Sequence, residues 1–296
     1  MKSRKTLGHI SAVITILIWG GTFTSIKLLL EKSTPLEILF LRFLIGFAVL
    51  CIIYPKTLKI KNKKEEIYFI GAGLCGVTLY YLLENIALTY TLVTNVGVIV
   101  SIAPFFVALS TYFFIKGSEK PGKEFFIGFL TAITGICLIS FNGSDIKINP
   151  FGDFLALAAS FVWSLYAVFT KKIGELGYNV IQTTRRTFFY GIIFMIPALF
   201  FLDFNLNFEN FKDFSYVFNI CFLGFGASAV CFVTWNNAVN LIGAVKTSAY
   251  IYAVPVLTIT ISAIVLHEEI TKQVIIGAGL ALLGLFVSQI KSFKKK

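Results

Sequence analysis

One acidic residue, Glu84, interrupts a long apolar stretch of the sequence. An ionisable group inside a membrane-spanning helix is costly unless it faces protein or water, so such residues commonly mark substrate or proton pathways. Tyr80 precedes Glu84 by one helical turn, which predicts that both side chains lie on one face. We interpret Glu84 as a proton-coupling site or a site for a substrate amine. Hydration near the outer interface, or a structural ion pair, is the alternative.

Three arginines, Arg42, Arg185 and Arg186, also lie inside apolar stretches. Arg42 and Arg186 are candidates for lining a solute pathway, where a guanidinium would attract a carboxylate or pair across a gate. Long basic side chains near the end of a span also extend routinely toward the lipid headgroups. The sequence leaves both interpretations open.

Two tryptophans, Trp19 and Trp163, fall in the middle of apolar stretches, although tryptophan in membrane proteins usually occupies the interface. Thr22 and Tyr166 follow them by three residues and therefore share their helix faces. These four side chains are candidates for the wall of a binding cavity. Aromatic packing between helices is the alternative.

Pro104 and Pro255 also occur in mid-stretch. Proline removes a backbone hydrogen bond and allows a helix to bend, and neighbouring helices can satisfy the freed carbonyl. We predict paired kinked helices beside the cavity that act as hinges, with a static kink as the alternative.

The elements that carry these residues are predicted from composition. Of 296 residues, 57% are hydrophobic and 14% are charged, and the mean hydropathy is +0.83. A helix needs about 20 residues to cross the hydrocarbon of a bilayer. We predict an all-α integral membrane protein with ten transmembrane helices: Leu7–Leu30, Leu36–Tyr54, Ile67–Leu88, Asn95–Ile115, Phe125–Phe141, Gly152–Lys171, Val180–Leu202, Phe214–Val239, Ala244–Leu266 and Val274–Ile290.

The distribution of the 26 lysines and arginines predicts the orientation. With the N-terminus inside, eighteen of them fall in inner connections or termini, five in outer connections and three within spans. Positive residues gather on the cytoplasmic side of a membrane, so both termini are predicted to lie in the cytoplasm. The predicted location is the cell membrane of a bacterium. The net charge of +11 comes from lysines that lie in the breaks between spans and not on one face. We therefore predict the lipid bilayer, and not nucleic acid, as the partner of this charge.

The two halves of the chain resemble each other at fixed offsets. An offset of 144 residues pairs Trp19 with Trp163 and Arg42 with Arg186, and an offset of 151 pairs Asn85 with Asn236 and Pro104 with Pro255. We therefore predict two five-helix repeats, residues 1–143 and 150–290, followed by a basic cytoplasmic tail, 291–296. A repeat with an odd number of spans enters the membrane from opposite sides, which gives the inverted repeats common in secondary transporters.

The residues that enzymes need are not arranged for catalysis. The five cysteines are scattered in apolar stretches, the two histidines lie at span ends, and no metal-ligand cluster, P-loop or catalytic triad is visible. We predict neither cofactor nor metal, and no enzymatic activity.

Several short motifs follow one another in a characteristic order along the chain: Trp19-Gly20-Gly21, Glu84-Asn85-Ile86-Ala87-Leu88-Thr89-Tyr90-Thr91, Ser101-Ile102-Ala103-Pro104, Gly243-Ala244, Val254-Pro255-Val256, His267-Glu268-Glu269, Gly277 and Gly284. Together they resemble the EamA-type branch of the drug/metabolite transporter superfamily, over essentially the whole chain. The second half departs from the pattern with Trp163-Ser164-Leu165 in place of Trp-Gly-Gly. The resemblance implies a carrier of amino acids, other metabolites or drugs.

The predicted function is secondary active transport, by alternating access, that exports a small organic solute such as an amino acid. A buried carboxylate with arginines suits a zwitterion, and proton coupling through Glu84 is one option. Efflux of lipophilic cations is the second candidate, and a channel is the third. Gly128, Gly135, Gly277 and Gly284 predict close helix packing, for which a homodimer interface is one location.

Overall fold

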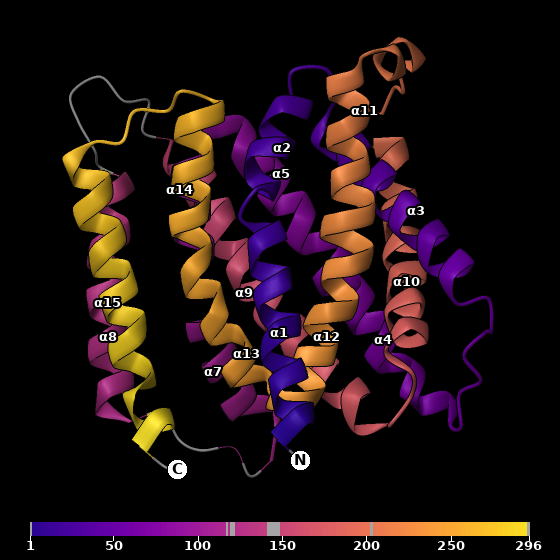
Figure 1. The fold of residues 1–296 in the computed structure, drawn as a ribbon, viewed down its shortest axis with the longest axis horizontal. Helices are drawn as coiled ribbons and strands as arrows, with labels where there is room; N and C mark the ends of the chain where they lie inside the picture. The colour runs from indigo at the N-terminus through magenta and orange to yellow at the C-terminus, as the bar shows by residue number, and fades with distance from the viewer. Residues whose placement is uncertain (1, 117, 119–121, 141–148, 202–203, 295–296) are drawn as a thin grey trace.

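The computed structural model describes the chain apart from residues 1, 117, 119–121, 141–148, 202–203 and 295–296. The described residues form helices and connections, with no β-strand among them. The helices run side by side as one bundle, and α1 begins at the same end of the bundle at which α15 finishes (Figure 1).

The first half of the chain contains eight α-helices: α1 (Lys2–Trp19), α2 (Thr22–Leu29), α3 (Pro35–Ile53), α4 (Glu66–Gly73), α5 (Tyr80–Tyr90), α6 (Val93–Val100), α7 (Ala103–Phe114) and α8 (Lys123–Ser140). The second half contains seven: α9 (Pro150–Glu175), α10 (Val180–Phe201), α11 (Phe214–Cys221), α12 (Cys231–Ile242), α13 (Ala244–Ser248), α14 (Val254–Val265) and α15 (Lys272–Lys294). Short 3-10 helices cover Lys63–Glu65, Phe208–Lys212 and Ala249–Ala253.

Six continuous helical segments of the described chain are long and apolar enough to cross a membrane: Arg4–Leu29, Pro35–Ile53, Lys63–Tyr90, Val93–Phe114, Pro150–Glu175 and Phe214–Ile242. Val254–Val265 and Lys272–Gly284 are shorter apolar helices. Two further predicted spans coincide with α8 and α10, although their last predicted residues, Phe141 and Leu202, lie outside the described part of the chain.

Most of the predicted basic tail, 291–296, belongs to the last helix. Helix α15 continues to Lys294, so residues 291–294 are helical, and Lys295 and Lys296 fall outside the described residues.

Both mid-stretch prolines stand at the start of a new helix. Pro104 is in the first turn of α7, after α6 ends at Val100, and Pro255 is in the first turn of α14, after the 3-10 helix Ala249–Ala253. The first turn tolerates proline because its N–H groups have no partner within the helix. The paired bends expected from the sequence are therefore paired helix breaks, and their movement stays a prediction.

Two π-helical segments occupy equivalent places in the two halves. They cover Leu74–Leu79 and Phe222–Val230, and the offset of 151 residues carries the first onto residues 225–230 of the second. A π-helix is wider than an α-helix and shifts the direction of the side chains that follow, often at functional sites. These segments lead directly into α5 and α12, which carry Glu84 and Trp235.

Helices α8 and α15 pack against each other at one edge of the bundle (Figure 1). Glycines allow this contact, because a Cβ atom on Gly135 would lie 2.4 Å from the carbonyl oxygen of Gly277, and one on Gly284 would lie 2.3 Å from that of Gly128. The four glycines thus join two helices of one chain. Their packing needs no second copy, and the homodimer stays an untested prediction.

We expect Gly284→Leu to lower the thermal unfolding temperature of the detergent-solubilised protein, because overpacking of a close backbone contact costs about 1–3 kcal/mol. Gly279→Leu is the matched control in the same helix, since a Cβ atom there meets nothing within 4 Å. Equal unfolding temperatures for the two variants in a thermal-shift assay would contradict the packing argument.

Candidate substrate site

A narrow cavity in the middle of the bundle receives side chains from both halves of the chain. Its room is sufficient for roughly two water molecules. The lining consists of Trp19, Thr22, Phe23, Tyr80, Tyr81, Glu84, Val100, Ala103, Trp163, Ile251 and Val254. Five residues predicted from the sequence are thereby brought together: Trp19, Thr22, Tyr80, Glu84 and Trp163.

The lining repeats the internal symmetry of the sequence. The offset of 151 residues converts Val100 into Ile251 and Ala103 into Val254, and these two pairs flank the two proline-associated helix breaks. The offset of 144 converts Trp19 into Trp163. Equivalent positions of the two halves thus face one shared space.

Glu84 is the acidic residue of this cavity. Its side chain is 1% exposed, and its Oε2 atom has no hydrogen-bond partner among the described residues. Tyr80 and the positive charge of Arg42 are both close enough to interact with the carboxyl group, although Arg42 forms no salt bridge with it. A buried polar atom without a partner carries a large desolvation cost. The free oxygen is therefore the natural acceptor for a proton or a substrate ammonium group.

Aromatic rings form much of the wall of this cavity. The ring of Trp163 lies 5.4 Å from that of Trp19, edge to face, and 4.9 Å from that of Tyr80. The Trp19 Nε1–H donates to the carbonyl oxygen of Ala227 (3.2 Å), which fixes its orientation. The indole nitrogen of Trp163 is buried without a described partner, so it is a spare hydrogen-bond donor beside the cavity.

Thr22 and Tyr166 differ in their positions. Thr22 lines the cavity, and its hydroxyl donates to the carbonyl oxygen of Trp19 (2.8 Å) where α1 gives way to α2. Tyr166 lies behind Trp163 at 4.8 Å and donates to Asn236 Oδ1 (3.0 Å). Gly76 makes room for its ring, because a Cβ atom there would lie 2.1 Å from Tyr166 Cδ2. Tyr166 therefore supports the wall and is not part of its surface.

Arg42 is completely buried, which rules out the interpretation that it extends to the headgroups. Its Nε–H donates to Ser228 Oγ (3.1 Å), and its guanidinium lies over the Tyr81 ring with Cζ 4.2 Å from the centroid. Nη1 and Nη2 have no hydrogen-bond partner among the described residues. Because Tyr81 lines the cavity, Arg42 supplies a positive charge directly behind its wall.

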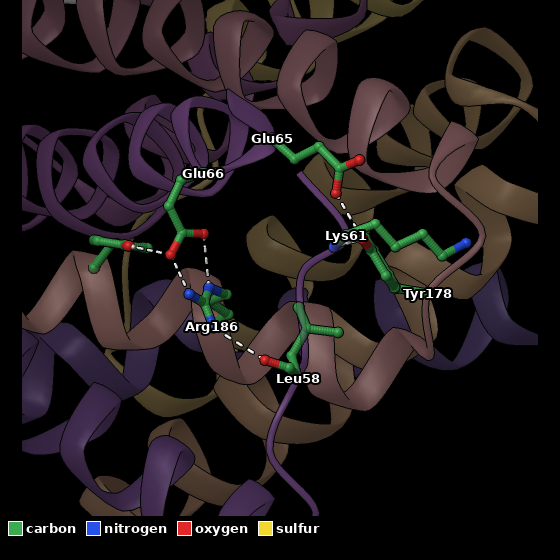
Figure 2. A network of polar contacts seen from close by, with 7 residues as sticks. Leu58, Lys61, Glu65, Glu66, Tyr178 and Arg186 are labelled. Atoms are coloured by element: carbon green, nitrogen blue, oxygen red, sulfur yellow. Dashed lines mark hydrogen bonds and ion pairs between the residues drawn. The ribbon is translucent and has the colours of Figure 1, made fainter. Parts of the chain in front are cut away.

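Arg186 lies elsewhere, beside Glu66, the first residue of α4 (Figure 2). It forms a salt bridge with Glu66, donates from Nε to Glu66 Oε2 (2.8 Å) and from Nη1 to the carbonyl oxygen of Leu58 (3.3 Å). Tyr190 donates to the same carboxylate (2.7 Å). These contacts join the two halves of the chain away from the cavity. The role of Arg186 in a solute pathway therefore stays a prediction.

A second set of contacts stands beside this ion pair. Tyr178 donates to Glu65 Oε2 (2.6 Å) and accepts from the backbone N–H of Lys61 (2.8 Å), as Figure 2 shows. Partial burial, followed by the neighbouring Glu65 carboxylate, raises the pKa of the Tyr178 hydroxyl. Arg185 donates to the carbonyl oxygens of Tyr54 (2.6 Å) and Lys56 (2.7 Å). Arg185 thus holds the end of α3.

The sequence did not single out three aromatic residues of the centre: Tyr81, Phe232 and Trp235. Trp235 is the counterpart of Glu84 at the offset of 151, and its ring lies 5.0 Å from that of Trp19. Tyr81 and Phe232 are counterparts at the same offset, and their rings lie 6.1 Å apart. For Tyr81 and Phe232, aromatic residues at equivalent positions of both repeats were the available signal. Tyr81 also precedes Glu84 by three residues, so helical spacing was a second signal for it.

The asparagines near the site hold helices together. Asn85 donates to the carbonyl oxygen of Pro35 (3.0 Å), Asn236 to Thr184 Oγ1 (3.0 Å) and Asn237 to Ser11 Oγ (3.1 Å). All three bonds connect different helices, which is the usual work of such residues in a bundle.

Comparison with known proteins identifies the class of protein that this fold and cavity belong to. The model of the EamA-like transporter family matches the chain twice, over residues 6–141 and 150–289. The chain therefore belongs to the EamA-like transporter family, and it is a multi-pass membrane transporter.

Individual relatives agree over their whole lengths. A protein of Archaeoglobus fulgidus described as an uncharacterized transporter is 28% identical over 292 residues, covering 96% of this chain and 97% of its own. The uncharacterized transporter YvbV of Bacillus subtilis is 25% identical and covers 99% of this chain and 94% of its own. A protein of known crystal structure, 18% identical, has the same fold with a TM-score of 0.69 over 99% of both chains.

We expect Ser228→Ala to destabilise the protein by about 1–3 kcal/mol, because it removes a hydrogen bond from the buried guanidinium of Arg42. Thr260→Ala is the control, since Thr260 is exposed and bonds only to its own helix. Thermal unfolding in detergent measures both. If Ser228→Ala unfolds at the temperature of the control, the Arg42–Ser228 contact carries little of the stability of the centre.

Proposed function

We propose that this protein is a secondary active transporter that exports a small organic solute, such as an amino acid or a related metabolite, by alternating access. The observation that carries this proposal is the buried carboxylate of Glu84, which has an unpartnered oxygen at a cavity shared by both halves of the chain. A carrier needs a binding site between two bodies that can separate on either side.

The proposed architecture is ten transmembrane helices in two inverted five-helix repeats, 1–143 and 150–290. Support comes from paired features: the π-helices before α5 and α12, the helix breaks before Pro104 and Pro255, and the matched lining positions Val100 and Ile251. An even number of crossings also agrees with the beginning of α1 and the end of α15 at one end of the bundle (Figure 1). We assign that end to the cytoplasm of a cell membrane, because most lysines fall there.

The polar groups of the centre favour a zwitterion. Glu84 supplies negative charge at the cavity surface, and Arg42 supplies positive charge behind Tyr81. An ammonium group would find the free oxygen of Glu84, and a carboxylate would be attracted toward Arg42 and the spare indole N–H of Trp163. The free oxygen of Glu84 and the indole N–H of Trp163 would then gain the partners that their burial demands.

Efflux of lipophilic cations is the second candidate. The aromatic wall of Trp19, Tyr80 and Trp163 around one carboxylate favours it, because aromatic faces attract cations. Competition of a lipophilic cation against radiolabelled amino acids in uptake assays separates the two substrate classes.

We expect Glu84→Gln to abolish most of the solute flux of proteoliposomes and to remove the pH dependence of any flux that is left, because glutamine neither binds a proton nor pairs with an ammonium group. The flux is measured with a panel of amino acids under an imposed pH gradient. Glu31→Gln is the control, since Glu31 is exposed at the end of the α2 region and outside the cavity.

Two outcomes of this experiment would contradict the proposal. A wild-type rate with unchanged pH dependence in Glu84→Gln removes the carboxylate from the mechanism. Flux that never saturates with solute concentration and follows the membrane potential indicates a channel instead of a carrier.

Pro104→Ala and Pro255→Ala test the two helix breaks. If the breaks before α7 and α14 move during the transport cycle, alanine lets the preceding helix continue, so we expect both variants to fold and to transport several-fold more slowly. Ala108→Gly, one turn beyond Pro104, is a control for general loosening of α7. Normal transport rates in both proline variants would make the breaks static features.

A further inference from the structure

A buried polar cluster joins the two halves of the chain at the opposite end of the bundle from Arg186. Thr91 follows the last residue of α5, Asn95 lies in the first turn of α6, and Asp153 lies in the first turn of α9. The Thr91 hydroxyl donates to Asp153 Oδ1 (3.0 Å), and Asn95 Nδ2 donates to Thr91 Oγ1 (3.1 Å). The three side chains are between 4% and 9% exposed.

The carboxylate of Asp153 is not fully satisfied within this cluster. Its Oδ2 atom is buried and has no hydrogen-bond partner among the described residues, and the carboxylate forms no salt bridge with any of them. The N-terminus of α9 offsets part of its charge. One hydroxyl and a helix end leave an oxygen with lone pairs and no positive partner.

Glu268, a second carboxylate of this region, has hydrogen-bond partners for both of its oxygens. It accepts from the backbone N–H groups of Val93 (3.0 Å) and Thr94 (3.1 Å) and from the Thr94 hydroxyl (2.6 Å). Lys27 is close enough to interact with it electrostatically and donates to the carbonyl oxygen of Leu88 (2.6 Å). The nearby lysine therefore already serves Glu268 and the end of α5.

We propose that Asp153, Thr91 and Asn95 form a binding site for a sodium ion. Hard cations take carboxylate, hydroxyl and amide oxygens. Asp153 and Thr91 offer the first two, and Asn95 carries the third on an amide whose nitrogen faces Thr91 in this structure. A single carboxylate balances one positive charge, which favours a monovalent ion over a divalent one. Rotation of the Asn95 amide turns its oxygen toward the ion, and the carbonyl end of α5 adds negative potential.

The position of this site gives the ion a role in coupling. Its ligands come from the α5–α6 junction of the first half and from α9 of the second, so the bound ion stabilises the contact between the halves. Thr91 lies seven residues after Glu84 in the chain, about 10 Å further along the helix at 1.5 Å per residue. Sodium binding would thereby favour one conformation of the cavity without entering it.

Thermal unfolding of the purified protein without solute tests the proposal directly. We compare sodium, potassium and choline chlorides at equal ionic strength and titrate sodium to saturation. We expect a saturable rise of the unfolding temperature in sodium alone, because an ion that binds only the folded state stabilises it. Asp153→Asn should abolish the rise. Equal unfolding temperatures in the three salts, or an undiminished sodium effect in Asp153→Asn, would overturn the proposal.

A second variant keeps the test decisive if Asp153→Asn does not fold. Thr91→Val preserves the shape and the charge but removes one ligand oxygen, so we expect the half-saturating sodium concentration to rise about tenfold or more. Thr89→Val is its control, because the exposed Thr89 hydroxyl bonds only to Ile86 of its own helix. Binding of radioactive sodium to detergent-solubilised protein gives the same constant directly. Identical sodium affinities for Thr91→Val and Thr89→Val would reject the site.

Discussion

Two ionisable residues of opposite sign, Glu84 and Arg42, lie in the interior of an apolar bundle without forming a salt bridge with each other. Each is expensive to bury, and the surroundings offset that cost only in part: Ser228 and the Tyr81 ring serve the guanidinium, and Tyr80 serves the carboxylate. Such a partly satisfied centre persists only when the surrounding packing leaves it no other arrangement. The aromatic core and the close helix contacts supply that constraint.

The helix breaks of this structure all lie beside the central cavity. Backbone groups inside a bilayer must be satisfied by the protein, so a break is tolerated only where protein surrounds it. At the break after α1, the Gly20 carbonyl oxygen accepts a hydrogen bond from Thr258. The wall residue Val100 ends α6 before the second break, and the wall residue Ile251 lies in the 3-10 helix Ala249–Ala253 before the third. The breaks therefore lie where the cavity is, and they come from both halves of the chain.

Periodicity and composition carry direct physical meaning in this chain. Long apolar stretches, the order of Trp19 and Trp163, and the intramembrane position of Glu84 predicted a membrane carrier with a central site. Five of the predicted site residues line one cavity. The contacts of long cationic side chains do not follow from these patterns. Arg42 and Arg186 occupy equivalent positions in the repeats, yet one is buried beside Tyr81 and the other pairs with Glu66. Local sequence does not reveal which neighbour a flexible side chain meets.

The sequence by itself determined that the protein lies in a lipid bilayer, that its two halves are similar, and that one acid, Glu84, interrupts an apolar stretch. The lengths of apolar stretches and the offsets between repeats are properties of the chain alone. Only the tertiary structure decided how those residues are used. It directed the glycines of α8 toward α15 of the same chain, put Tyr166 behind the wall, and made the prolines the start of new helices. Those outcomes depend on contacts between residues far apart in sequence, which are fixed only when all the helices pack together.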